Sequence, residues 1–131
     1  MHIVTVYAAL LALIFVGLSV RTLRMRRRLQ IAVGDAANPE MLRAMRAHAN
    51  FAEYVPLSLI LIYFVESTGT SKYFVHALGS SILVGRILHA YGVSQVKETF
   101  SFRVAGMALT LTPLIAAALC LLFVFVSAGL S

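Results

Sequence analysis

Charged residues are scarce in this sequence. Asp, Glu, Lys and Arg make up 12% of the 131 residues, whereas water-soluble proteins carry roughly 25%. Hydrophobic residues make up 60%. A chain of this composition cannot cover its apolar surface with charge, which excludes an ordinary water-soluble domain. We therefore expect its surface to face membrane lipid.

Cysteine, proline and tryptophan are also rare or absent, with one Cys, three Pro and no Trp. The single Cys120 excludes a disulfide framework and a thiolate metal cluster, and its apolar neighbours indicate a buried structural thiol. His48 and His89 have no second close His, Cys or carboxylate that completes a chelating set on their own helices, so no metal site is predicted. A glycine-rich phosphate loop is absent as well.

Four apolar stretches are predicted to be transmembrane helices, at residues 3–27, 40–66, 72–92 and 102–130. The uncharged part of the first stretch, residues 3–20, corresponds to about 27 Å of helix, close to the thickness of the bilayer core. A signal peptide is the competing interpretation, but the positive cluster follows the apolar stretch instead of preceding it, so we expect no cleavage. The fold expected is one all-α integral-membrane domain over residues 1–131, a four-helix transmembrane bundle.

Basic residues are concentrated after the first apolar stretch, where the acids are Asp35 and Glu40. The cluster abuts an uncharged apolar segment and has no interleaved aromatic residues, so no nucleic-acid interface is expected. The positive-inside rule instead places this loop in the cytoplasm and both termini outside. Seven of the eleven basic residues form the cluster: Arg21, Arg24, Arg26, Arg27, Arg28, Arg43 and Arg46.

A polar stripe runs along the second predicted helix. Arg43, Arg46, Asn50 and Glu53 are spaced i, i+3, i+7 and i+10 and so share one helix face. Ionisable groups inside a membrane cost at least about 2.5–3.5 kcal/mol each on insertion scales, and they normally face the bundle interior or a water-filled cavity. Arg86 and His89 on the third predicted helix, and Arg103 at the start of the fourth, are predicted to approach the same region.

Two interpretations of this cluster are open. Glu53 could neutralise Arg46 or Arg86 as a buried pair that fixes helix packing. Alternatively, because Arg46, Arg86 and Arg103 outnumber the single carboxylate, the excess of buried cations predicts an anionic ligand.

The same residues carry a family resemblance. The run at residues 42–56 contains Arg-x-x-x-Asn-x-x-Glu-x-x-Pro and resembles the second-helix signature of the MAPEG family, the membrane-associated proteins of eicosanoid and glutathione metabolism. The run Val-Gly-Arg-Ile-Leu-His-Ala-Tyr at residues 84–91, followed by Phe102, Arg103 and Gly106, is similar to the later helices of that family. The resemblance covers essentially the whole chain.

The resemblance implies a homotrimer that binds glutathione at its subunit interfaces near the cytoplasmic side. It implies a catalytic arginine, Arg103, close to the glutathione sulfur. An arginine at the end of the first helix also contributes in the family; Arg21, Arg24 and Arg26 are all candidates, and Arg24 is favoured. The glutathione-binding residues expected by position are Arg24, Arg46, Asn50, Glu53, Arg86, His89 and Tyr91.

Two departures from the family argue against a prostaglandin-isomerase activity. Val104 stands where the prostaglandin E synthase member has a serine, and Tyr91 follows His89 by two residues where that member has a spacing of four. The leading hypothesis is a bacterial-type inner-membrane glutathione transferase that acts on hydrophobic electrophiles from the bilayer, with lipid hydroperoxide reduction as a further activity. The alternative is a non-catalytic lipid-binding or scaffold protein of the same family.

The first testable prediction concerns assembly. We expect a homotrimer whose interfaces bury small residues such as Ala8, Ala9, Ala12 and Gly17, because small side chains let membrane helices approach closely. The detergent-corrected mass of the purified protein measures the subunit number. A stable monomer that still bound glutathione would remove the interface-site hypothesis.

Overall fold

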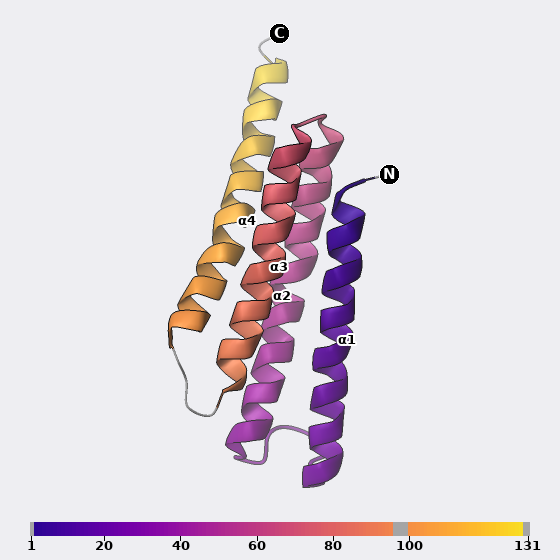
Figure 1. The fold of residues 1–131 in the computed structure, drawn as a ribbon, viewed down its shortest axis with the longest axis vertical. Coiled ribbons are helices and arrows are strands. Elements are labelled where there is room, and N and C mark those ends of the chain that lie inside the picture. Colours follow the sequence, from indigo (N-terminus) through magenta and orange to yellow (C-terminus); the bar gives the residue numbers. More distant parts are fainter. Residues whose placement is uncertain (1, 96–99, 130–131) are drawn as a thin grey trace.

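The computed structural model describes residues 2–95 and 100–129, and these form four helices connected by short segments (Figure 1). The helices are α1 (Val4–Leu29), α2 (Pro39–Ser67), α3 (Lys72–Ser94) and α4 (Phe100–Gly129). The described residues contain no strand, so the all-α prediction is confirmed. The bounds of the four helices differ from those of the predicted stretches by at most two residues. Residue 130 and the loop residues Lys97 and Glu98 lie outside the described part of the chain.

Three of the helices, α1, α2 and α4, are long and apolar enough to cross a membrane. The 23 residues of α3 give a length of about 35 Å, but this helix carries Lys72, His76, Arg86 and His89, which lower its hydropathy. Large apolar side chains point outward from the bundle, for example Leu13 and Phe125, which are 70% and 78% exposed. This outer surface suits contact with lipid acyl chains.

The start of α1 and the end of α4 lie toward one end of the bundle, and the α1–α2 loop lies at the other (Figure 1). Several side chains fix this loop. The Asn38 side chain accepts a hydrogen bond from the Met41 amide at 2.9 Å, and Pro39 occupies the first turn of α2, where its missing N–H costs nothing. Arg26 Nη1 donates to the Gly34 carbonyl at 3.0 Å. These contacts fix the start of α2 at Pro39, one residue before the predicted start.

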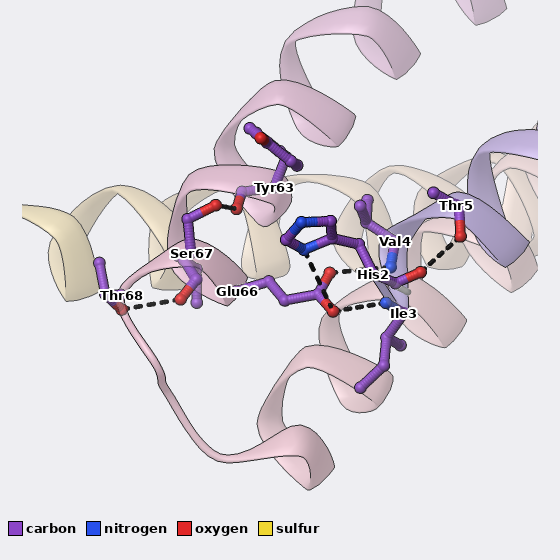
Figure 2. Close-up of polar contacts among 9 residues, drawn as sticks. His2, Ile3, Val4, Thr5, Tyr63, Glu66, Ser67 and Thr68 are labelled. Atoms are coloured by element: carbon purple, nitrogen blue, oxygen red, sulfur yellow. Dashed lines mark hydrogen bonds and ion pairs between the residues drawn. The ribbon is translucent and has the colours of Figure 1, made fainter.

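The opposite end of the bundle is held by a carboxylate (Figure 2). Glu66, in the last turn of α2, accepts hydrogen bonds from the backbone N–H groups of Ile3 and Val4, the latter at 3.0 Å. The first N–H groups of a helix have no partner within the helix and attract negative charge. Glu66 of α2 therefore caps the N-terminus of α1. His2 Nδ1 lies 3.7 Å from the same carboxylate.

Glycines allow α3 and α4 to pack closely. A methyl group placed on Gly106 would lie 2.5 Å from the backbone nitrogen of His89 and 2.7 Å from the Gly85 carbonyl oxygen. A methyl group on Gly85 would in turn lie 2.9 Å from the Gly106 carbonyl oxygen. Because there is no apolar driving force between helices in lipid, such small residues let backbones gain van der Waals contact. The pair brings α4 directly against the polar part of α3.

Pro113 lies buried inside a continuous α4. A proline lacks the N–H that would bond to the carbonyl four residues earlier, here that of Leu109. Ser81 Oγ of α3 donates to the Leu109 oxygen at 2.8 Å. A neighbouring helix thus satisfies the carbonyl that the proline leaves free, as is required in a membrane.

The glycine contact generates a prediction about stability. Gly106→Ala should lower the free energy of unfolding by about 1–3 kcal/mol, because the new methyl group must push backbone atoms of α3 away. Gly129→Ala is the matched control, since nothing lies within 4 Å of a methyl group there, and its effect should stay within about 0.5 kcal/mol. Reversible unfolding in mixed detergent micelles measures both. Equal stability of the two variants would contradict the close packing.

Candidate functional site

A cavity of about 510 Å³ opens between α2, α3 and α4, in the half of the bundle nearer the α1–α2 loop. Its volume falls within the range of small-molecule sites, about 300–1,000 Å³. Ten of the described residues line it: Pro39, Leu42, Arg43, Arg46, Ala49, Asn50, Glu53, His89, Val93 and Arg103.

One face of α2 supplies seven of these ten residues. The polar members are the four of the predicted stripe, Arg43, Arg46, Asn50 and Glu53, so the helical spacing did place them together. Arg43 Nη1 also donates to the Val93 carbonyl near the end of α3 at 3.3 Å, where helix carbonyls lack intrahelical partners. The helix therefore presents cationic, amide and carboxylate groups to one space.

Glu53 forms no ion pair within 4 Å among the described residues. The two ion pairs there are His2–Glu66 and Arg28–Glu40, both remote from the cavity. The interpretation in which Glu53 directly neutralises Arg46 or Arg86 is therefore not what the structure shows. The carboxylate is exposed on the cavity wall and is available to a cationic group of a ligand.

Arg86 lies behind the cavity wall instead of lining it. Its side chain is completely buried, and Nη2 donates to Asn50 Oδ1 at 2.8 Å and reaches His89 Nδ1 at 3.4 Å. The guanidinium carbon also lies 5.7 Å from the Phe51 ring centroid and 5.6 Å from that of Tyr54, within the distance of cation–π attraction. Arg86 thus contacts two candidate residues without touching the cavity.

Arg103 reaches the cavity from the first turn of α4. The approach depends on Gly92, because a methyl group there would lie 3.1 Å from the Arg103 nitrogen and 3.2 Å from its Cγ. The Arg103 guanidinium carbon lies 5.7 Å from the centroid of the Phe100 ring. The glycine contact between α3 and α4 therefore places this arginine across the cavity from the stripe on α2.

Two predicted site residues lie away from this cavity within a single chain. Arg24 lies on a separate groove of about 510 Å³ along α1, together with Gly17, Val20, Arg21, Met25 and Arg28. Tyr91 is 54% exposed, and its ring packs edge-on against Phe102 with centroids 5.5 Å apart. Neither residue shares a wall with Glu53 in one subunit.

Thr110, Phe51 and Tyr54 support the site, although no sequence pattern singled them out. Thr110 Oγ1 accepts from Arg86 at 3.5 Å, and it lies seven residues after Arg103, a spacing that returns to the same helix face. Phe51 and Tyr54 flank Glu53's stripe but carry no charge, so composition gave no reason to single them out. Arg43 was in the predicted stripe but was not assigned to glutathione binding.

The arrangement suits an organic anion better than a metal ion. The described residues contain no group of three or more His, Cys, Asp or Glu side chains that could hold a metal. Guanidinium groups bind carboxylates through parallel hydrogen bonds. The described residues that border this cavity include three arginines and one carboxylate. The site therefore fits a ligand with several anionic groups and one cationic group.

The fold and the site define an α-helical membrane protein with a cationic, partly enclosed cavity at one end of its bundle. The chain belongs to the MAPEG family, whose model matches residues 4–123. It is 36% identical over 104 residues to the inner membrane protein YecN of Escherichia coli strain K12, which covers 79% of this chain and 78% of that protein. The YecN protein of E. coli O6:H1 matches to the same extent.

Proposed function

We propose that the protein is a membrane glutathione transferase that activates the glutathione thiol for attack on hydrophobic electrophiles. Glutathione carries two carboxylates, one ammonium group and a thiol. A matching site needs several arginines, one carboxylate and a donor for the sulfur. The cavity holds Arg43, Arg46 and Arg103 together with Glu53, which is this combination.

The observation that carries the proposal is the position of Glu53. Its carboxylate lies on the wall of a cavity bordered by arginines and forms no ion pair within 4 Å among the described residues. A purely structural carboxylate would be expected to pair with its cationic neighbours. A carboxylate kept available beside cations instead favours a zwitterionic ligand, whose ammonium group it would accept.

In this proposal the chain assembles as a homotrimer, as the family resemblance implies. The α1 residues Ala9, Ala12 and Gly17 are exposed in the single chain, and a methyl group on Gly17 would contact nothing within 4 Å. A neighbouring subunit packed along this face would bring its α2–α4 cavity close to the groove that holds Arg24. Arg24 of one subunit would then complete the glutathione site in the cavity of its neighbour.

The chemical step that we propose is thiolate attack. A free thiol with a pKa of about 8.5 is only about 3% ionised at pH 7, and lowering its pKa by about two units requires roughly 2.7 kcal/mol. The Arg103 guanidinium would supply this by stabilising the thiolate. The sulfur then forms a bond to an electrophilic carbon, the leaving group departs with its electron pair, and the thiol proton passes to water. Reduction of a lipid hydroperoxide would consume two glutathione molecules and release the alcohol, water and glutathione disulfide.

We also propose an inner-membrane location, since the related YecN protein is named an inner membrane protein. The basic end of α1, which carries Arg24, Arg27 and Arg28, would face the cytoplasm. Glutathione from the cytoplasm would then reach the cavity, and an apolar electrophile would arrive from the bilayer.

Calorimetric titration of glutathione into the purified protein, followed by a conjugation assay with 1-chloro-2,4-dinitrobenzene, tests the proposal. Binding with turnover supports the transferase. Binding of lipid without glutathione binding would reject it and favour the non-catalytic lipid-binding or scaffold alternative.

The role of Glu53 is tested by removing its charge. Glu53→Gln should weaken glutathione binding by about 1–3 kcal/mol, because the charge-assisted hydrogen bond to the ammonium group is lost. Arg46→Ala should weaken binding similarly through a glutathione carboxylate. The matched controls are Glu40→Gln and Arg27→Ala, which change the same charges outside the cavity. Normal binding by folded Glu53→Gln and Arg46→Ala proteins would show that these residues serve structure alone.

The role of Arg103 is tested by separating binding from chemistry. Arg103→Leu should reduce turnover much more than glutathione affinity and should raise the pKa of the bound thiol, because a contact to sulfur favours the thiolate selectively. Ultraviolet thiolate absorbance followed against pH reads the ionisation directly. Arg103→Lys, which keeps the charge, should retain part of the effect. An unchanged titration midpoint in folded Arg103→Leu protein would reject Arg103 as the activating residue.

A further inference from the structure

The surroundings of Arg86 carry information about two residues of the cavity wall. The side chain has no exposed surface, and its hydrogen-bond partners in the described chain are all uncharged. Nη2 faces Asn50 Oδ1 at 2.8 Å and His89 Nδ1 at 3.4 Å. Nη1 faces Thr110 Oγ1 at 3.5 Å and Met107 Sδ at 4.0 Å. Within the described part of the chain, the Nε atom of Arg86 has no hydrogen-bond partner.

A guanidinium group can donate hydrogen bonds but cannot accept them. Every atom that faces Nη1 or Nη2 must therefore be an acceptor. Thr110 meets this requirement, since its hydroxyl hydrogen is donated to the Gly106 carbonyl at 2.7 Å and its oxygen lone pairs remain for Arg86. The same reasoning applies to His89 and Asn50. The proton of a neutral imidazole can sit on either ring nitrogen, and an amide group can be turned so that its oxygen and nitrogen exchange places.

For His89, the contact requires Nδ1 to be without a proton. A neutral imidazole then carries its single proton on Nε2. For Asn50, the contact requires the amide oxygen to face Arg86, which turns the NH₂ group away from it. Because both residues also line the cavity, the atoms left for a ligand are the donor groups Nε2–H and NH₂.

We propose that Arg86 is a positioning residue that holds His89 in its Nε2–H tautomer and fixes the Asn50 amide with its NH₂ group toward the cavity. Arg86 acts through these two side chains and does not touch the ligand. The rings of Phe51 and Tyr54, each within 6 Å of the guanidinium carbon, hold its plane in place.

This arrangement makes the cavity selective for anionic groups. Besides the arginines, the two uncharged polar residues contribute donors. Among the described residues that line the cavity, Glu53 is the one carboxylate. A ligand with more carboxylate and thiolate groups than ammonium groups is matched by such a wall. The choice of ligand rests on the proposed function, whereas the tautomer and the amide orientation are properties of the protein without ligand.

The direct test is magic-angle-spinning NMR of protein labelled with ¹³C and ¹⁵N histidine, in bilayers and without glutathione. Correlations of each ring nitrogen with Cγ or Cδ2 identify which nitrogen carries the proton, and the signal missing in His89→Gln assigns His89. We expect an unprotonated Nδ1 and a protonated Nε2. An Nδ1–H tautomer in the wild-type protein would overturn the proposal without recourse to a variant that has to fold.

Variants then test whether Arg86 is the cause. Arg86→Met should give a mixture of His89 tautomers, and Arg86→Lys, which keeps a donor, should restore part of the Nε2–H population. Arg21→Met is the matched control, because Arg21 donates to Ser94 and has no hydrogen bond to His89 or Asn50 among the described residues. A folded Arg86→Met protein with the wild-type spectrum would show that another group sets the tautomer.

The amide orientation has its own test. Asn50→Asp keeps an oxygen for Arg86 but replaces the NH₂ donor with a second oxygen that faces the cavity. We expect thermal stability to be maintained and glutathione binding to fall at least about tenfold, since a donor becomes a repelling acceptor. Unchanged binding would reject the amide orientation. If the wild-type protein bound no glutathione, the proposed function would fail while the NMR result on His89 would still decide the role of Arg86.

Discussion

A charged guanidinium inside a membrane bundle constrains everything packed around it. Arg86 is fully enclosed, and removing a charge from water without compensation costs several kcal/mol. The bundle compensates with oxygen, nitrogen and sulfur acceptors from α2, α3 and α4 and with two aromatic faces. These contacts link the three helices that form the cavity, so the site and the packing of this half of the molecule have the same origin.

Close backbone contact makes that compensation possible. Gly106 lies directly against the backbone of His89, and Gly92 lies against Arg103. Larger residues at these positions would move α4 outward and draw Thr110 and Arg103 away from α3. The glycines therefore bring the hydrogen-bond acceptors within reach of Arg86. These acceptors in turn lower the free-energy cost of burying its charge.

Two glutamates of α2, Glu66 and Glu53, have different roles. At the end that holds the chain termini, the Glu66 carboxylate is consumed by the first N–H groups of α1 (Figure 2). Near the middle of α2, Glu53 lines the cavity together with Arg43, Arg46 and Arg103 and makes no ion pair within 4 Å among the described residues. Glu66 therefore caps α1, whereas Glu53 faces the cavity and is available to a ligand. Both residues lie on α2, so their position on this helix alone does not distinguish the two roles.

The sequence by itself determined the helices and the polar stripe. Lipid requires long apolar helices, and a spacing of three or four residues places Arg46, Asn50 and Glu53 on one face whatever surrounds them. Only the tertiary structure decided what each polar residue contacts, because a contact between α2, α3 and α4 depends on helix rotation and separation. Helical spacing could not show that Arg86 lies behind the wall, or that Arg24 and Tyr91 lie outside the cavity of a single chain. Nor could it show that Glu53 has no ion pair within 4 Å among the residues that the structure describes.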